Sequence, residues 1–395
     1  MGIKEHRPMD FHWSEEQEMF LSLFRDFAQK EVAPRAEETD HQEKPPMEVL
    51  RRAAMQGFLG ATLPEEQMGA GLDHVSYGLL IEELAKACLS TALIVAIHNS
   101  LVAETILAFG SPEQQETYLP MLAAGEAIGA FALNEADAGA DFSRLATRAI
   151  RQDDGYLLRG SKWWVANGEI AGLFIVFAAS DPTANGRGLS AFLVEADTPG
   201  LRVAHREPTL GLRGLPLNVL YLDDCQVPAA NRLGAEGDGY AIAVAALDRF
   251  RIALGSAALG VSEAALAAGV RFASERKQFD ALIAQKQAIQ NFIAEAKARI
   301  EGLRYLVYHA GWLLDQGADV EETAALVKLW AGEVSRFVTD KMVQVHGGYG
   351  YMEEYPISRM YRDARALGLI GGPTELQRVT IARSLFAPLG VEILP

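Results

Sequence analysis

Apolar and polar residues follow one another in three different ways along this chain, and the changes predict three domains. Residues 1–126 and 237–395 carry apolar side chains at the three- and four-residue spacing of amphipathic helices. Residues 127–236 contain short runs rich in β-branched and aromatic residues, separated by turn residues, which is typical of strands. We therefore expect an α+β protein with an N-terminal helical domain, a middle β-domain and a C-terminal helical bundle.

Residues at the expected helix ends support the helical interpretation. Ser14 and Gln17 form a capping-box pattern at the start of the first helix. Asp319 is expected to cap a late helix, and Gly347 is expected to end it. The expected helix before Asp319 has one apolar face, formed by Ile289, Ile293, Ala296, Ile300, Leu303, Val307 and Leu314.

Turn residues and β-rich runs define the middle domain. Asp154-Gly155 predicts a hairpin, because Asp-Gly supports the positive φ angles of a tight turn. Leu173–Ala179 and Leu189–Glu195 are short runs expected to form strands. Leu217–Leu222 is expected to form the last strand of the domain.

Composition excludes several classes of protein. The chain has 395 residues, about half of them apolar, so disordered and collagen-like structures do not fit. Its formal charge of −16 argues against nucleic acid or an anionic membrane as the main partner. The two cysteines predict no disulfide framework and no metal cluster. With no signal-type N-terminus and no apolar run near the ~20 residues of a membrane span, we expect a cytoplasmic protein.

Two segments contain residues suited to hold a flat, polar ligand. In FALNEADAGADFSRL (131–145), Gly139 allows the backbone to approach a ligand closely and Asn134 offers hydrogen bonds. In SKWWVANG (161–168), Trp163 and Trp164 provide large planar surfaces. Considered alone, the first segment is better interpreted as an ordinary strand-to-loop junction, and two tryptophans next to a turn are most often core residues.

A third segment, HGGYGYMEEYPISRMYRDARALGLIGGPTELQR (346–378), favours ligand binding for the first two segments. In this order and spacing the three segments resemble the signatures of the acyl-CoA dehydrogenase family, flavoproteins that oxidise an acyl thioester between Cα and Cβ. The resemblance covers nearly the whole chain and implies a middle domain that is β-barrel-like and a C-terminal four-helix bundle. It also implies FAD, an acyl-CoA or carrier-bound acyl thioester, an electron-transferring flavoprotein as a partner, and a homotetramer built as a dimer of dimers.

The resemblance assigns the flavin ring to the first two segments. The implied cofactor positions there are Phe131, Leu133, Asn134, Gly139, Ala140, Trp164 and Ala166. Three of them depart from the family pattern. Asn134 replaces a threonine, Ala140 replaces a serine, and Ala166 replaces the hydroxyl residue that approaches flavin N5.

Further cofactor positions are implied in the C-terminal domain, where the family binds FAD held mainly by a neighbouring subunit. These positions are Arg276, Gln278, Phe279, Gln287, Gln344, Gly347, Gly348, Pro373 and Glu375. An arginine fork such as that of Arg276 suits a diphosphate. The residue after Phe279 is Asp280 where the family has glycine.

Substrate positions are implied at Ala140, Asp248 and Arg251. The last two match family positions that line the acyl-CoA pocket. The alternative for Asp248 and Arg251 is an ion pair on a helix surface, which contributes little to stability.

The proton-accepting carboxylate of the family is missing from both of its known positions, which here are Gly371 and Phe250. Abstraction of an α-proton requires a positioned base, and Asp248 and His98 are weak candidates. Three hypotheses follow: an acyl-thioester oxidoreductase with its base elsewhere, a redox-neutral lyase or isomerase, or a catalytically silent FAD-binding paralogue.

Overall fold

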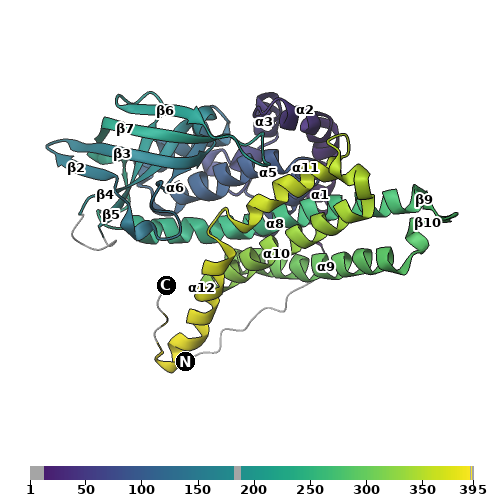
Figure 1. Cartoon of the computed structure of the whole chain (residues 1–395). Coiled ribbons are helices and arrows are strands. Elements are labelled where there is room, and N and C mark those ends of the chain that lie inside the picture. Colours follow the sequence, from purple (N-terminus) through teal and green to yellow (C-terminus); the bar gives the residue numbers. More distant parts are fainter. Residues whose placement is uncertain (1–12, 182–187, 392, 394–395) are drawn as a thin grey trace.

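The computed structural model describes residues 13–181, 188–391 and 393. Helices come first, a sheet follows, and long helices complete the chain, so the expected succession is confirmed. The sheet lies at one end of the molecule, and a small hairpin between the long helices lies at the other (Figure 1). Residues 1–12, which contain nearly all of the N-terminal segment expected not to be a signal sequence, lie outside the described residues.

The N-terminal domain is built from short helices around a buried apolar core. They are α1 (Glu15–Phe27), α2 (Ala36–His41), α3 (Met47–Met55), α4 (His74–Ala87), α5 (Leu89–Ala96), the π-helical segment η5 (Ile97–Ala103), α6 (Glu104–Phe109) and α7 (Pro112–Ala123). The expected capping box is present, because Ser14 Oγ accepts from the Gln17 N–H and the Gln17 side chain accepts from the Ser14 N–H.

The middle domain is one mixed sheet. Its strands are β1 (Ile128–Ala132), β2 (Arg148–Gln152), β3 (Gly155–Ala166), β4 (Ala171–Ala179), β5 (Leu189–Glu195), β6 (Leu201–Arg206), β7 (Leu217–Pro228) and β8 (Arg232–Leu233). The order is β6-β7-β3-β2-β4-β5-β8, and β1 pairs in parallel with β4. The predicted hairpin is confirmed, with Gln152 opposite Gly155. The prediction of a last strand at Leu217–Leu222 is wrong in two respects, because β7 continues to Pro228 and β8 follows it.

Long helices form the C-terminal domain. They are α8 (Gly239–Glu275), α9 (Gln287–Asp315), α10 (Glu321–His346), α11 (Pro356–Ala364) and α12 (Thr374–Phe386). Helix α8 packs against α4, α9 and α10, and α12 packs against α10. A hairpin of β9 (Lys277–Gln278) and β10 (Ala281–Leu282) joins α8 to α9. As expected, the Asp319 carboxylate accepts from the Glu321 N–H and α10 ends at Gly347, which has φ +60°.

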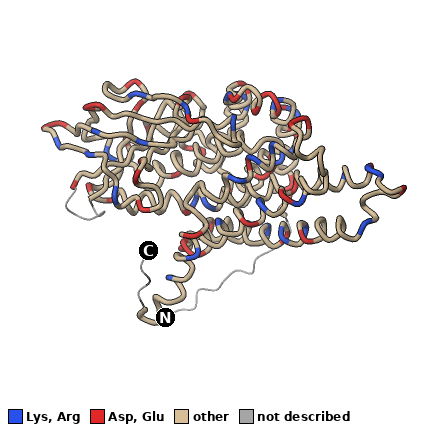
Figure 2. Tube along the Cα trace, in the orientation of Figure 1, with Lys and Arg blue, Asp and Glu red and all other residues tan. Residues whose placement is uncertain are grey.

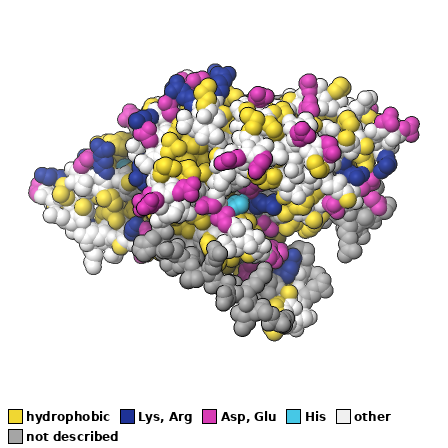
Figure 3. Space-filling model, turned by 180° about the vertical axis from the view of Figure 1, so that it is seen from behind, with side chains coloured by type: hydrophobic (Ala, Val, Ile, Leu, Met, Phe, Trp, Pro, Cys, Tyr) yellow, Lys and Arg dark blue, Asp and Glu magenta, His cyan; other side chains and the backbone are white. Residues whose placement is uncertain are grey.

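Two helical stretches are long and apolar enough to cross a membrane, Leu89–Phe109 and Gly239–Glu275. They are 83% and 72% buried inside the protein over their most apolar windows, which is the burial of core helices. Acidic and basic residues are both spread over the whole described chain (Figure 2), and both kinds are mixed with apolar side chains on the face seen in Figure 3.

Candidate functional site

The first two sequence segments meet in space. The Trp163 N–H donates to the Asn134 carbonyl at 2.9 Å, and Lys162 Nζ donates to the Leu133 carbonyl at 3.1 Å. The residues that follow β1 and the last residues of β3 therefore lie side by side, at the edge of the sheet that the ends of these strands form. The Asn134 amide also donates to the Gly139 carbonyl at 3.3 Å, so this side chain shapes its own loop.

A buried ion pair that the sequence analysis missed stabilises this edge. Lys162 is fully buried, and its Nζ lies 2.8 Å from Glu135 Oε1. Glu135 also accepts from the N–H groups of Ala146 and Thr147, at 2.6 and 3.0 Å. Burial lowers the pKa of Lys162 to about 8, against the opposing effect of Glu135. Burial raises the pKa of Glu135, but the charge and hydrogen bond of Lys162 outweigh it and leave that pKa below its ordinary value.

Trp164 is presented by a distortion of β3. Its φ is +56°, and the pairing of β3 with β7 shifts register between Lys162 and Val165. The Trp164 ring is 49% exposed and lies edge-on to Trp163, with ring centroids 6.3 Å apart. A left-handed backbone at a bulky residue is a strained conformation that concentrates at ligand sites. Trp164 is thus an open aromatic surface and not a core residue.

The C-terminal positions surround a cavity of about 830 Å³ next to the β9–β10 hairpin. Five of the implied cofactor residues line it: Arg276, Gln278, Phe279, Gly347 and Gly348. The Arg276 guanidinium lies over the Tyr349 ring, 5.3 Å from its centroid. Lys286 adds a second cation to the lining. Two cations beside the glycine backbone at the end of α10 suit a diphosphate, and the aromatic rings suit a flat ring system.

The remaining C-terminal positions lie outside this lining. Gln287 begins α9, Gln344 is exposed on the last turn of α10, and Glu375 is exposed on the first turn of α12. Pro373 directly precedes α12 as its cap residue.

The two groups of cofactor residues lie far apart within one chain. Trp164 lies two residues before the end of β3 in the sheet domain, whereas Phe279 is at the tip of the β9–β10 hairpin, which lies at the end of the molecule away from the sheet (Figure 1). The residues of each group fit a part of FAD, one the ring and the other the diphosphate.

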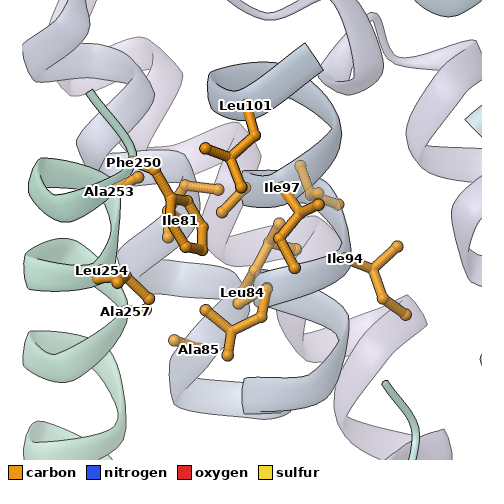
Figure 4. Packing of buried hydrophobic residues seen from close by; sticks show 14 of the residues in the cluster. Ile81, Leu84, Ala85, Ile94, Ile97, Leu101, Phe250, Ala253, Leu254 and Ala257 are labelled. Atoms are coloured by element: carbon orange, nitrogen blue, oxygen red, sulfur yellow. The ribbon is translucent and has the colours of Figure 1, made fainter. Parts of the chain in front are cut away.

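The two positions that the resemblance assigns to a catalytic carboxylate, Gly371 and Phe250, are structurally unlike each other. Gly371 has φ +74°, and its carbonyl accepts from Arg251 Nε at 3.0 Å. Phe250 is 2% exposed and belongs to an apolar cluster between α8 and the N-terminal helices (Figure 4). Neither position supplies a proton acceptor.

Asp248 and Arg251 form a buried pair beside Gly371. Arg251 Nη1 donates to Asp248 Oδ1 at 2.6 Å, and the two residues are only 6% and 8% exposed. The alternative of an ion pair on a helix surface is therefore wrong. Burial raises the pKa of Asp248 to about 6, although Arg251 acts to lower it.

His98 is occupied by structural hydrogen bonds, which argues against its candidacy as a base. Its Nε2 donates to the Leu59 carbonyl at 2.9 Å, and its Nδ1 accepts from the Gly129 N–H at 2.9 Å. The ring is fully buried, and burial lowers the pKa of His98 to about 4. With both ring nitrogens in use, this residue joins η5 to β1 and has no free lone pair for a substrate proton.

A helical domain, a sheet domain and a helical bundle with these two groups of cofactor residues define an FAD-dependent flavoprotein oxidoreductase. Residues 14–126, 130–225 and 237–386 match the N-terminal, middle and C-terminal domains of acyl-CoA dehydrogenase. The chain belongs to the acyl-CoA dehydrogenase family.

Individual relatives cover the whole chain. An acyl-CoA dehydrogenase of Bacillus subtilis (strain 168) is 40% identical, over 95% of this chain and 99% of the relative. An acryloyl-CoA reductase (NADH) of Anaerotignum propionicum is also 40% identical, over 98% of each chain. The solved structure of butyryl-CoA dehydrogenase from Megasphaera elsdenii superposes with a TM-score of 0.94 at 38% identity, over 96% of this chain and 100% of that one.

Proposed function

We propose that this protein catalyses FAD-dependent transfer of hydrogen at the Cα–Cβ bond of an acyl-CoA thioester. The observation that carries the proposal is the match over all three domains to relatives named acyl-CoA dehydrogenase, acryloyl-CoA reductase and butyryl-CoA dehydrogenase. FAD, when bound, supplies the acceptor for the hydride that leaves the β-carbon. The chain itself must orient the thioester and take the proton from its α-carbon.

Asp248 is the proposed proton acceptor. Glycine and phenylalanine occupy the two family positions, and the hydrogen bonds of His98 remove the other candidate. The Asp248 carboxyl is buried on α8, and Arg251 links it to the Gly371 carbonyl. A pKa of about 6 is suited to a general base near neutral pH. Arg251 fixes the carboxyl in one orientation.

A second copy of the chain completes the proposed cofactor site. Trp164 belongs to the sheet domain, and the cavity with Arg276 adjoins the β9–β10 hairpin, which lies at the end of the molecule away from the sheet (Figure 1), so one FAD would contact both groups across an interface. We propose a homotetramer arranged as a dimer of dimers, located in the cytoplasm. An electron-transferring flavoprotein is the proposed partner that exchanges electrons with it.

Anaerobic reduction tests the reaction. Purified protein loaded with FAD is mixed with saturated acyl-CoAs, and bleaching of the visible flavin absorbance is followed against pH. We expect bleaching whose rate rises as the pH rises through about 6, because the Asp248 carboxyl must be ionised to accept a proton. Absence of bleaching by every saturated acyl-CoA, together with no reoxidation of reduced flavin by unsaturated ones, would contradict the proposed reaction.

Substitution then tests the proposed base. Asp248→Asn keeps the size of the side chain and should slow bleaching by about 10²–10⁴-fold. Asp340→Asn, at an exposed position on α10, is the matched control and should leave the rate unchanged. Normal bleaching by Asp248→Asn would remove Asp248 from this role and leave the reaction class standing.

A further inference from the structure

His74 lies between two carboxylates that come from two different domains. Its Nδ1 lies 2.6 Å from Asp315 Oδ1, and its Nε2 lies 3.7 Å from Glu104 Oε1. His74 is the first residue of α4 and Glu104 is the first residue of α6, whereas Asp315 is the last residue of α9 in the C-terminal bundle. The start of α4 packs closely against α9, because a Cβ added to Gly311 would lie 3.3 Å from the His74 carbonyl. A carboxylate beside each ring nitrogen suits an imidazolium, because only the protonated ring carries an N–H on both nitrogens.

Glu104 is a buried carboxylate whose hydrogen bonds are incomplete. The residue is 5% exposed, and Thr62 Oγ1 donates to its Oε1 at 2.6 Å. Its Oε2 accepts no hydrogen bond from the described residues, and Arg249 Nε on α8 lies 3.9 Å from it. A charge in this position gains from any cation nearby, because water does not screen the interaction. Protonated His74 therefore stabilises the Glu104 carboxylate.

We propose that His74, Glu104 and Asp315 form a proton-controlled latch between the N-terminal domain and the C-terminal bundle. The imidazolium attracts both carboxylates and holds the end of α9 against α4 and α6. When the ring loses its proton, one nitrogen turns a lone pair towards a carboxylate, and the two carboxylates repel each other across the ring. The His74 backbone N–H still donates to Asp315 at 2.9 Å, so the contact loosens but does not vanish.

The charged groups around His74 favour a change of its charge near neutral pH. Burial acts to lower the pKa of His74, but the hydrogen bond of Asp315 and the charges of Glu104 and Asp315 outweigh it and raise that pKa above its ordinary value. Arg249 acts from α8 to lower it. Tyr77, on α4 near Glu104, stays uncharged, because burial raises its pKa far above neutral pH.

The direction of the pH effect follows from the raised pKa. The latch contributes stability that is complete below the unfolded-state pKa of about 6.5 and is lost as the pH rises through the higher folded-state pKa. We therefore expect the free energy of unfolding in urea to fall further between pH 5 and pH 8 in the wild-type protein than in His74→Gln. His205→Gln is the matched control, because the His205 side chain is 61% exposed and pairs with Glu207. This control should keep the dependence of the wild-type protein.

Nuclear magnetic resonance measures the protonation of His74 directly, in FAD-loaded protein labelled with carbon-13 at histidine Cε1. The signal of His74 is assigned by its loss in His74→Gln, and we expect its titration midpoint above 6.5. Glu104→Gln keeps the size of the side chain and removes its charge, so it should lower the midpoint. Glu207→Gln is the control, because it removes the partner of His205 and should leave the midpoint of His74 unchanged.

Hydrogen exchange of peptides that cover residues 311–320 reports opening of the latch. After correction for the intrinsic pH dependence of exchange, these amides should exchange faster at pH 8 than at pH 5 in the wild-type protein. They should exchange fast at both pH values in His74→Gln. Each unit by which the midpoint of His74 exceeds 6.5 corresponds to about a tenfold change in the equilibrium for opening.

Three results would overturn the inference: a midpoint of His74 at or below 6.5, an unchanged midpoint in Glu104→Gln, or equal corrected exchange of the wild-type protein at the two pH values. The titration and exchange of the wild-type protein decide the question even if a variant does not fold. Both measurements are made without acyl-CoA or turnover, so their outcome is independent of the proposed reaction.

Discussion

Arg251 holds the loop that contains Gly371, because its Nε lies 3.0 Å from the Gly371 carbonyl oxygen. The same guanidinium donates through Nη1 to Asp248 at 2.6 Å. One buried cation therefore links the proposed base on α8 to the backbone of Gly371. This arrangement makes the stability of the site depend on a single side chain.

Arg251→Met should destabilise the protein by about 3–5 kcal/mol, because it leaves the buried Asp248 carboxyl without its partner. Arg251 acts to lower the pKa of Asp248, so its removal should raise that pKa further above 6. A group that holds its proton more tightly in the folded state loses its contribution as the pH rises, so the loss should be larger at pH 8 than at pH 5.

Urea unfolding at the two pH values measures this effect. Arg271→Met is the matched control, because the ion pair of Arg271 with Glu275 is exposed. Such pairs contribute about 0–1 kcal/mol. Equal losses of unfolding free energy in the two variants would show that the Asp248–Arg251 pair does not determine the stability of the site.

Gly371→Glu should fail as a way to restore a dehydrogenase carboxylate, although the resemblance makes it the obvious substitution. Gly371 has φ +74°, and a Cβ would lie 2.8 Å from Leu254 Cδ1. A non-glycine residue in this conformation costs about 1–3 kcal/mol. Phe250→Glu avoids backbone strain on the right-handed helix α8, although it buries a carboxylate in an apolar cluster and so raises its pKa. It should bleach the flavin faster than Gly371→Glu with butyryl-CoA.

The rate of flavin bleaching and the free energy of unfolding are measured for both glutamate variants. Gly302→Ala is the control, because a Cβ there meets nothing within 4 Å and the residue lies within α9. That control should stabilise the protein by about 0.5–1 kcal/mol. A stable Gly371→Glu variant that reacts faster than Phe250→Glu would disprove the expectation.

The pair of Lys162 and Glu135 should govern how well the sheet edge retains FAD. Lys162→Met leaves Glu135 buried with its two backbone donors only, and should cost about 3–5 kcal/mol. The pKa of Glu135 is lowered, so the pair contributes stability above pH 4.5 that is lost as the pH falls below it. We expect the variant to lose FAD on gel filtration and to show a weaker acid dependence of stability.

Arg159→Met, on the same strand, is the matched control, because Arg159 pairs with Asp224 at an exposed position. It should keep both FAD and stability. Full FAD content in Lys162→Met, measured from the ratio of flavin to protein absorbance, would count against a role of this pair in shaping the site.

Features set by neighbouring residues were predictable from the sequence. The capping box of Ser14 and Gln17 and the turn before Gly155 depend on a few consecutive residues, and both are present as expected. The helix and sheet succession followed from apolar spacing, because burial of one face requires that spacing in any helix or strand.

Features set by contacts between distant segments were not predictable in this way. Lys162 meets Glu135 across 27 residues, and no local pattern distinguishes a fully buried lysine from an exposed one. The resemblance located Gly371, but only its φ of +74° and its distance to Leu254 show that a side chain is poorly tolerated there. Likewise, the burial of Asp248 follows from the packing of α8 and not from its neighbours in sequence.

Phe279 is a large apolar residue that packs against almost nothing within one subunit. It lies at the tip of the β9–β10 hairpin with φ +53°, and its ring is 91% exposed. A large apolar side chain in a left-handed turn is costly unless another molecule covers it. Phe279→Ala should therefore leave the unfolding free energy of the isolated subunit within about 0.5 kcal/mol while it weakens assembly and FAD retention.

Sedimentation at several protein concentrations, with flavin absorbance recorded alongside, measures both effects. Met55→Ala is the matched control, since Met55 is 83% exposed on α3, away from the cavity near Arg276. The control should sediment and retain FAD as the wild-type protein does. If Phe279→Ala behaved like the control in both measurements, a cofactor site shared between copies would lose its support, because this exposed ring beside the cavity would then contact neither FAD nor a second subunit.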